Sequence, residues 1–274
     1  RDSKAYAMSD DEILARGQEA VANGCTEMHI VGGLHHQKPY DWYVHIVRIL
    51  HESFPKLHLK AWTGVEINWF EFLSKKSVHA ILEEMRDAGL GSMRGGGAEI
   101  FHPEVRDQIC EHKADAKNWF DIHRTAHELG LKTNCTMLYG HIETLAERVD
   151  HLLRLRAQQD ESKGFQTFIP LAYQVGSTKL VRRRTPPTDD LQTISASRLL
   201  LDNFPHVEAY WVMIGEATTS VALHFGAEGP KVHQCPPQAP EKIGRLCTLG
   251  PKVPKCIHAR RRRQKKKIWR LCTL

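Results

Sequence analysis

Short apolar runs alternate with amphipathic stretches along the first two hundred residues of the chain. The runs have the length of β-strands and are bounded by glycine or polar clusters. They cover residues 27–31, 57–62, 131–138 and 165–171, with a weaker run at 89–93 and a late one at 207–213. Helix-length stretches with apolar residues three or four positions apart lie between them and begin near Ser9, Asp41, Ser77, Asn118 and Glu143. Because a parallel neighbour is reached only by a crossover, this order predicts six or seven parallel βα units.

The residues that follow the strands favour a β/α barrel over a doubly wound sheet, which the alternation alone would also fit. Four of the runs end in glycine or polar residues that include an acid or a histidine. The carboxyl ends of barrel strands form the catalytic face of that fold, so we expect these residues to converge on one mouth. They are Gly32, Gly33 and His35; Thr63 and Glu66; Gly95, Gly96, Gly97 and Glu99; and Tyr139, Gly140, His141 and Glu143.

These residue types predict binding chemistry, and each also has an ordinary structural interpretation. The glycine run 95–97 would let backbone N–H groups approach a carboxylate or a phosphate, although a tight turn also uses glycine. Glu66, Glu99 and Glu143 as a set can bind an ammonium group or ribose hydroxyls, whereas each alone can be an acid at a helix start. The candidate proton carriers or hydrogen-bond donors, which can equally be caps or surface residues, are His35, Tyr139 and His141.

Composition and charge change this picture in two places. Seven scattered cysteines, with no CxxC pair and no CxxxCxxC triplet, predict reduced thiols and offer no ligand set for zinc or an iron–sulfur cluster. The sequence has no membrane-length apolar run and no signal-peptide pattern, so we expect a soluble cytoplasmic protein without a membrane partner. The net charge of +6 comes largely from residues 258–267. We interpret that segment as a solvated end, and nucleic acid is not the expected partner.

The pattern divides the chain into two regions. Residues 1–227 carry the strand and helix pattern, whereas residues 228–274 contain scattered prolines and a basic run without apolar periodicity. We therefore expect a folded barrel region over 1–227 and a disordered tail over 228–274 that reads like a shifted frame or a spurious extension.

Long phrases between residues 6 and 227 resemble the aminodeoxyfutalosine synthase family of radical S-adenosylmethionine (SAM) enzymes. They include HIVGGLH (29–35), HLKAWTGVEI (58–67), GGGAEIF (95–101), IHRTAHELGLKTNCTMLYGHIET (122–144) and AYWVMIGEATTSVALHFGA (209–227). The resemblance implies a radical SAM barrel of the TIM type, in which a 4Fe-4S cluster reductively cleaves SAM. It also implies addition of the 5′-deoxyadenosyl radical to a small-molecule substrate, 3-[(1-carboxyvinyl)oxy]benzoate, in menaquinone biosynthesis. A reductant such as flavodoxin or ferredoxin would be the protein partner.

Carried over position by position, the family's site residues fall on the predicted strand ends. The resemblance implies that Gly32 and Gly33 meet the methionine end of SAM. The further cofactor-binding positions that it implies are Glu66, Gly96, Gly97 and Glu99, together with Gly140 and Glu143 beside the adenine. The positions that it places on the substrate side are His35, Thr63, Tyr139 and His141.

The chain also departs from the family pattern. The family's CxxxCxxC motif falls before position 1, so the resemblance implies a partial barrel whose first βα unit is missing, no metal ligands in this chain, and no activity of the chain alone. Arg94 stands where the family has proline before the glycines. The alternatives are another radical SAM enzyme of the same pathway, such as cyclic dehypoxanthine futalosine synthase, a non-catalytic barrel that binds a nucleoside or RNA, and a metal-dependent barrel hydrolase.

Overall fold

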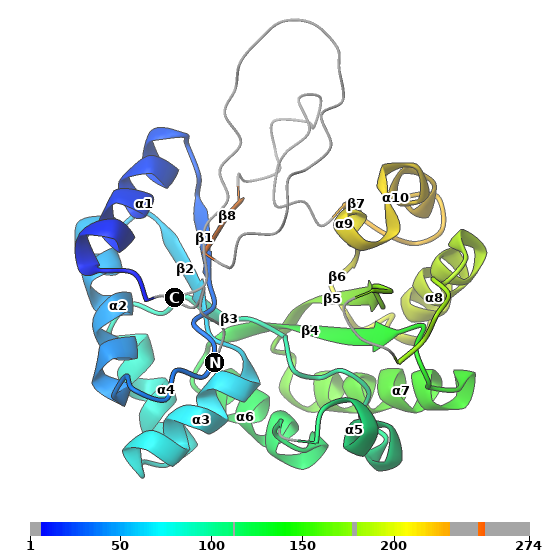
Figure 1. The fold of residues 1–274 in the computed structure, drawn as a ribbon, viewed down its shortest axis with the longest axis horizontal. Coiled ribbons are helices and arrows are strands. Elements are labelled where there is room, and N and C mark those ends of the chain that lie inside the picture. The colour runs from blue at the N-terminus through cyan, green and yellow to red at the C-terminus, as the bar shows by residue number, and fades with distance from the viewer. Residues whose placement is uncertain (1–6, 112, 177–179, 231–245, 250–274) are drawn as a thin grey trace, which may run out of the picture.

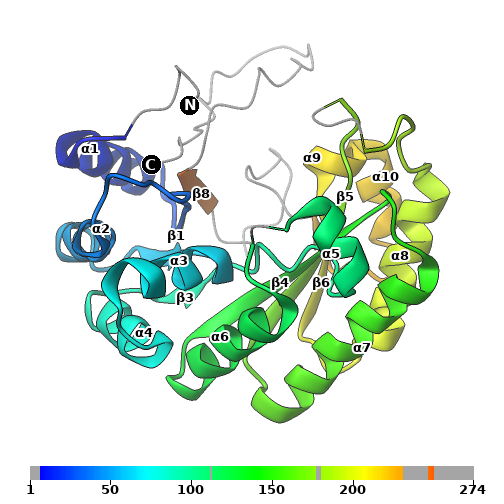
Figure 2. The same cartoon turned by 60° about the horizontal axis from the view of Figure 1, so that its bottom comes forward.

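The computed structural model of the protein describes residues 7–111, 113–176, 180–230 and 246–249. Its strands form a parallel sheet in the order β7-β6-β5-β4-β3-β2-β1-β8. The sheet is curved and carries the long helices on its outer side, which gives a partial TIM-type barrel as the sequence predicts (Figures 1 and 2). The strands are β1 (Glu27–Ile30), β2 (His58–Ala61), β3 (Ser92–Met93), β4 (Lys132–Tyr139), β5 (Phe165–Ala172), β6 (His206–Ala209), β7 (Gly229–Pro230) and β8 (Leu246–Leu249).

Local sequence signals begin and end the helices. Capping boxes, in which a Ser or Thr and a Glu three residues later bond each other's backbone N–H, begin α1, α3 and α7. Gly89 and Gly130, each just after a helix, have φ of 108° and 80° and lead into the next strand. The helices are α1 (Asp10–Ala22), α2 (Tyr40–Ser53), α3 (Gly64–Ser74), α4 (Val78–Asp87), α5 (Pro103–Ile109), α6 (Ala116–Glu128), α7 (Leu145–Ser162), α8 (Pro187–Leu200), α9 (Trp211–Ile214) and α10 (Glu216–Ala222).

The prediction of a last strand over residues 207–213 is confirmed only in its first half. Residues 207–213 were expected to be extended, but β6 ends at Ala209 and the apolar residues that follow form the helical turn α9. Gly215, with φ of 84°, closes this turn and joins it to α10. A short apolar run fits either state, so periodicity alone does not separate a buried strand from a buried turn.

The expected tail lies mostly outside the described residues. Within it, Leu246–Leu249 form β8, which pairs in parallel with β1, and Gly229–Pro230 form β7 beside β6. These two short strands are the described parts of a region that the sequence predicts to be mostly disordered.

Two hydrophobic clusters fill the space between the sheet and the helices. One joins the helix-facing residues of β1–β3 to α1–α4 and includes Met28, Ile30 and Leu59. The other joins β4–β6 to α5–α10 and includes Met137 and Phe168. Burial of these side chains is the main favourable term that holds the half-barrel together.

The inner face of the first strands is polar instead of apolar. In β1 and β2 the residues alternate, with Met28 and Ile30 toward the helices and Glu27 and His29 on the opposite face. Lys60, only 6% exposed, ion-pairs with Glu27 at 3.1 Å on that face. A concave face lined by charged and polar groups suits a ligand better than a packed barrel core.

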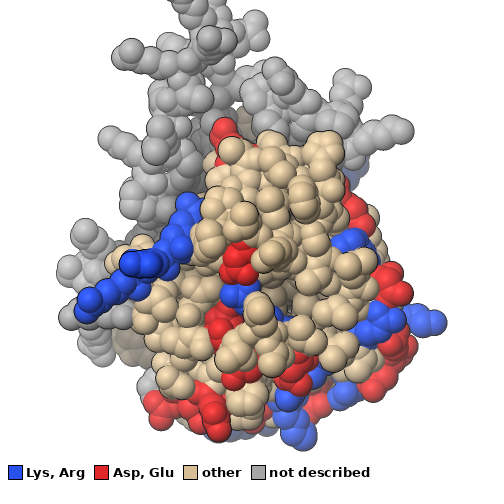
Figure 3. Space-filling model, turned by 90° about the vertical axis from the view of Figure 1, so that its right-hand side faces the viewer, with Lys and Arg blue, Asp and Glu red and all other residues tan. Residues whose placement is uncertain are grey.

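One outer face carries few charged side chains. Over α8 and α10 the surface is largely free of Lys, Arg, Asp and Glu (Figure 3), and it exposes Leu199, Leu223 and Phe225. No helix in the described residues is long and apolar enough to cross a lipid bilayer, in line with the sequence expectation of no membrane-length run.

Candidate functional site

Glu66 joins the ends of β1 and β2. Its carboxylate, 3% exposed, accepts hydrogen bonds from the backbone N–H groups of Gly32 (2.7 Å) and Gly33 (3.0 Å). Its second oxygen accepts from the N–H and the hydroxyl of Thr63, at 2.7 and 3.0 Å. Burial raises the pKa of Glu66, and these four donors oppose that shift. The structure therefore brings four predicted site residues together, with Glu66 fixing the glycine loop from α3.

The backbone around this carboxylate is constrained on one side and open on the other. Trp62, fully buried at the end of β2, has φ of 61°, which is unfavourable for a bulky residue and is held by its packing against Tyr43 and Phe70. Gly33 also has a positive φ of 65°, but a side chain at that position would meet nothing within 4 Å. The open space beside Gly33 leaves its backbone accessible.

The glycine loop after β3 packs against its neighbours. A Cβ on Gly95 would lie 2.4 Å from the backbone of Asn134, and one on Gly97 would lie 2.3 Å from Val65. Gly96 lies beside Thr63, whose methyl group would be 3.0 Å from such a Cβ. Gly95 and Gly97 fit the structural interpretation of this run, because close packing requires glycine there. Gly96 adjoins the Glu66 cluster, which fits the ligand-binding interpretation.

Arg106 is a residue that sequence reasoning missed. It is 5% exposed, and its guanidinium donates to the carbonyl groups of Gly97, Ala98 and Ile100 as well as Ala114. These bonds fix the loop from α5. An arginine in a helix carries no local signal of such a role, because its acceptors are backbone atoms of a folded loop.

Glu143, in the loop after β4, holds backbone N–H groups as Glu66 does. We call the two arrangements the Glu66 clamp and the Glu143 clamp. Its side chain is fully enclosed and accepts from the N–H groups of Gly140 (2.6 Å) and His141 (2.9 Å) and from Arg148 Nε (2.7 Å). His141 donates from Nε2 to the carbonyl of Leu138 at 3.0 Å, and its Nδ1 lies 3.1 Å from Glu143. Gly140, His141 and Glu143 are thus brought together, separately from the Glu66 cluster.

Three predicted residues lie apart from both clamps. Glu99, with φ of 47°, forms an ion pair with Lys113 at 2.6 Å. Tyr139 is buried on the helix side of β4, where its hydroxyl donates to Asp190 at 2.7 Å, and burial first and Asp190 second raise its pKa. His35 is partly exposed in the β1 loop, and its N–H donates to the hydroxyl of Tyr43.

The amino-terminal part of the inner face holds a charged cluster that was also missed. Glu27 contacts Lys60 and His29, and although burial alone would raise its pKa, these two groups lower it to about 2. His58 reaches the hydroxyl of Ser92 at 2.7 Å on the same face. The alternation of polar and apolar residues in 27–30 and 58–61 was the signal, because it marks one polar face on each strand.

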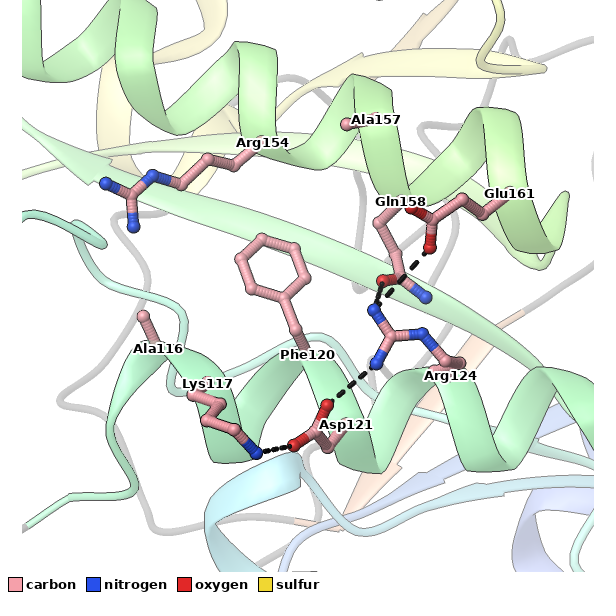
Figure 4. A pocket seen from close by; sticks show the side chains of 9 residues that line it. All are labelled: Ala116, Lys117, Phe120, Asp121, Arg124, Arg154, Ala157, Gln158 and Glu161. Atoms are coloured by element: carbon pink, nitrogen blue, oxygen red, sulfur yellow. Dashed lines mark hydrogen bonds and ion pairs between the residues drawn. The ribbon is translucent and has the colours of Figure 1, made fainter.

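A groove of about 440 Å³ lies outside the barrel, between α6 and α7 (Figure 4). Its charged side chains pair with one another: Asp121 accepts from Lys117 at 2.6 Å and from Arg124 at 2.7 Å. It lies away from the carboxyl ends of the strands and contains none of the predicted site residues, so its size alone does not make it the functional site.

Metal ligands do not converge in the described residues. No group of three or more His, Cys, Asp and Glu side chains in that part of the chain can hold a metal ion. Cys25, Cys110 and Cys135 form no disulfide and lie in separate segments of the chain. These residues do not fit an iron–sulfur cluster, which needs several convergent thiolates. His123 and His127, which have zinc-site spacing, instead share the hydroxyl of Thr133 at 2.9 Å.

Comparisons with known proteins identify the family of this fold. The profile of the radical SAM superfamily matches residues 1–155, and that of the CofH/MqnC C-terminal region matches residues 162–230. The chain belongs to the radical SAM superfamily, as the resemblance implies. It is similar to the aminodeoxyfutalosine synthases of Thermus thermophilus and Streptomyces coelicolor, with 46% and 47% identity over 81% and 82% of this chain. It spans 61% of the length of each of these relatives.

A second group of relatives is less similar. The 5-amino-6-(D-ribitylamino)uracil--L-tyrosine 4-hydroxyphenyl transferase of Methanopyrus kandleri is 35% identical over 82% of this chain and 63% of its own length. The similarity to the synthases thus exceeds the similarity to these transferases over the same share of the chain.

Proposed function

We propose that this chain carries the SAM-binding and substrate-binding part of an aminodeoxyfutalosine synthase. The observation that carries the proposal is the 46–47% identity to two such synthases, against 35% to a transferase of the same superfamily. The matched region contains the strand ends and loops at which barrel enzymes contact their substrates, so the higher overall identity favours the synthase over another futalosine-pathway enzyme.

The residues at the ends of β1–β3 fit SAM. The backbone at Gly33 faces open space, and the carbonyl oxygens of such a loop can accept from the ammonium group of the cofactor's methionine portion. Glu66 then acts as a positioning residue, because its own oxygens are occupied by Gly32, Gly33 and Thr63. When bound, SAM supplies the 5′-deoxyadenosyl group that is joined to the enol ether of 3-[(1-carboxyvinyl)oxy]benzoate.

The second clamp would flank the adenine. Glu143 holds the N–H groups of Gly140 and His141, so the loop after β4 presents a fixed backbone edge that an adenine ring can pack against. His35, with its partly exposed ring, is the predicted substrate-side residue with most freedom to move a proton. Thr63, Tyr139 and His141 already donate to Glu66, Asp190 and Leu138, and their substrate-side role stays a prediction.

The described residues do not hold the ligands of an iron–sulfur cluster. The cluster and a reductant such as flavodoxin or ferredoxin belong to the proposed activity of a complete enzyme. Gly96, Gly97 and Glu99 are proposed to line the cofactor side through the loop that Arg106 fixes.

Product analysis tests the proposal. The complete enzyme that contains this chain is incubated with SAM and a reductant, in one reaction with 3-[(1-carboxyvinyl)oxy]benzoate and in a parallel reaction with dehypoxanthine futalosine, and the products are resolved by mass spectrometry. Formation of aminodeoxyfutalosine is expected. Turnover of dehypoxanthine futalosine instead would assign the chain to the sister enzyme, and turnover of neither would remove the pathway assignment.

A further inference from the structure

Arg94, an arginine of intermediate exposure, lies outside the two clamps on the inner face of the half-barrel. Arg94 follows β3 directly, and its N–H donates to the carbonyl of Trp62 at 2.9 Å. Its Nη1 atom is buried and has no hydrogen-bond partner in the described part of the chain. A buried guanidinium without an acceptor is costly, and such a group is usually completed by an anion.

The alternation of side chains along β3 places Arg94 on the concave side of the sheet. Met93 belongs to the hydrophobic cluster under the helices, so Ser92 and Arg94 share the opposite face. Ser92 lies beside Lys60 in the register, and its hydroxyl is 2.7 Å from Nε2 of His58. Arg94 thus continues the polar inner face toward the carboxyl ends of the strands.

The groups that interact electrostatically with Arg94 come from both ends of the curved sheet, which agrees with a position of Arg94 on the concave face. Burial lowers the pKa of the Arg94 guanidinium. The groups that counter this shift are Glu66, Tyr210 and Glu27, which come from α3, from the end of β6 and from β1. Groups from β1 and β6 can act together on one side chain only inside the concave face.

The acidic neighbours of Arg94 are already engaged. Glu66 accepts from four donors of the glycine loop and Thr63, and Glu27 is held by Lys60 and His29. Met93 pairs with Thr133 in the register, so Asn134, the next residue of β4, lies across from Arg94. The Oδ1 atom of Asn134 is also buried and has no hydrogen-bond partner in the described residues. A half-turn of this amide would present its NH₂ group beside the guanidinium.

We propose that Arg94, assisted by Asn134, binds a carboxylate group of a ligand that occupies the barrel interior. The carboxylate accepts from Nη1 of Arg94 with one oxygen and from the Asn134 amide with the other. The assignment rests on the proposed function, which offers two sources of a carboxylate: the methionine end of SAM and the carboxylates of 3-[(1-carboxyvinyl)oxy]benzoate. Glu66 and Arg94 would then have separate tasks, the first in holding the loop and the second in holding charge.

The test compares Arg94→Met with Arg124→Met in the full chain. Arg124 is a matched control, because it is an arginine on the outer groove whose charge is paired with Asp121. Each protein is titrated by calorimetry with SAM and, separately, with 3-[(1-carboxyvinyl)oxy]benzoate. We expect Arg94→Met to weaken one of the two ligands about tenfold to a hundredfold and Arg124→Met to change neither. The weakened ligand identifies the source of the carboxylate.

Thermal unfolding without ligand gives the second measurement. If Arg94 awaits an anion, Arg94→Met removes an unpaired buried charge, and Tm is expected to rise by about 2–5 °C. A fall in Tm would mean that Arg94 is the counter-charge of Glu66 and would overturn the proposal, as would wild-type affinity of Arg94→Met for both ligands. If the unsubstituted chain binds neither ligand, the proposed function fails. A raised Tm would then still support an anion site for a different carboxylate, and an unchanged Tm would overturn it.

Discussion

Glu66 and Glu143 perform the same task at opposite sides of the half-barrel in different electrostatic settings. Each is enclosed and accepts from two consecutive backbone N–H groups after a strand. Glu66 receives its other two bonds from Thr63, and no cation of the described residues lies within hydrogen-bond distance of it. Glu143 has Arg148, which also donates to Asp189 and Thr193.

The two sites differ in what offsets the loss of hydration of the carboxylate. At Glu66 all four hydrogen bonds come from neutral donors, so each of the four bonds matters. At Glu143 a guanidinium supplies a full charge, and the loop depends less on any single bond. Glu66 accepts from Gly32, which lies 34 residues earlier in the sequence, whereas the N–H groups that bond Glu143 belong to its own loop. The loss of Glu66 therefore removes a connection between two elements.

The largest effect is expected for Glu66→Ala. The substitution leaves the N–H groups of Gly32 and Thr63 buried without acceptors, and we expect a loss of about 4 kcal/mol in the free energy of unfolding. Denaturant titration measures it, with Glu66→Gln, expected to cost about 2 kcal/mol, as the variant that keeps shape. A loss below 1 kcal/mol for the alanine variant would show that water replaces the carboxylate.

The glycines that the two glutamates hold are expected to respond in unequal ways. Gly140→Ala combines a φ of 84° with a Cβ that would lie 1.9 Å from Oγ1 of Thr185, so about 3 kcal/mol of stability should be lost. Gly33→Ala meets only open space at φ of 65° and should cost about 1 kcal/mol. Thermal unfolding of the two variants side by side checks the order, and equal losses would contradict the open space beside Gly33.

Glu27 extends the comparison between the two glutamates, because this carboxylate at the other end of β1 is held by Lys60 and His29. Its pKa of about 2 lies below the ordinary value of 4.5, so the unfolded chain takes up the proton first as pH falls. The stability from this group is therefore complete above pH 4.5 and is lost as pH falls toward 2. We expect a loss of about 2 kcal/mol in that window, reduced by partial exposure. Denaturant titrations from pH 5 to 2.5 would show a flatter profile for Glu27→Gln, and parallel profiles would refute the assignment.

Sequence reasoning found the elements and several members of the site, and physical limits explain what it missed. The short apolar runs between amphipathic stretches predicted β1, β2, β4 and β5. The glycine and acidic residues that follow these runs predicted Gly32, Gly33 and Glu66 as site positions. The T-x-x-E spacing of Thr63 and Glu66 also contains the capping box that the structure shows. These signals are local, and therefore they are visible in the sequence.

The missed features depend on contacts between distant segments. The bonds from Glu66 to Gly32 and from Arg106 to the loop after β3 exist only once the strands are aligned. The positive φ of Trp62 has no sequence signal, because aromatic residues rarely adopt it. The inner polar face did have a signal in the alternation of β1 and β2, but its meaning depends on knowing which face is concave.

The smallest effect is expected for Glu143→Gln. Arg148 keeps its bonds to Asp189 and Thr193, and Gly140 and His141 are partly exposed, so water can reach the N–H groups that lose a charged acceptor. We expect a loss of about 1 kcal/mol, half of that for Glu66→Gln. In an Arg148→Met background the attraction between the two groups is already lost, so Glu143→Gln should cost less there, and the loss in the double variant should be about 1 kcal/mol smaller than the sum of the two single losses. Additive losses in this double-mutant cycle would mean that Arg148 does not hold Glu143, and the contrast between the two clamps would then lie in their burial alone.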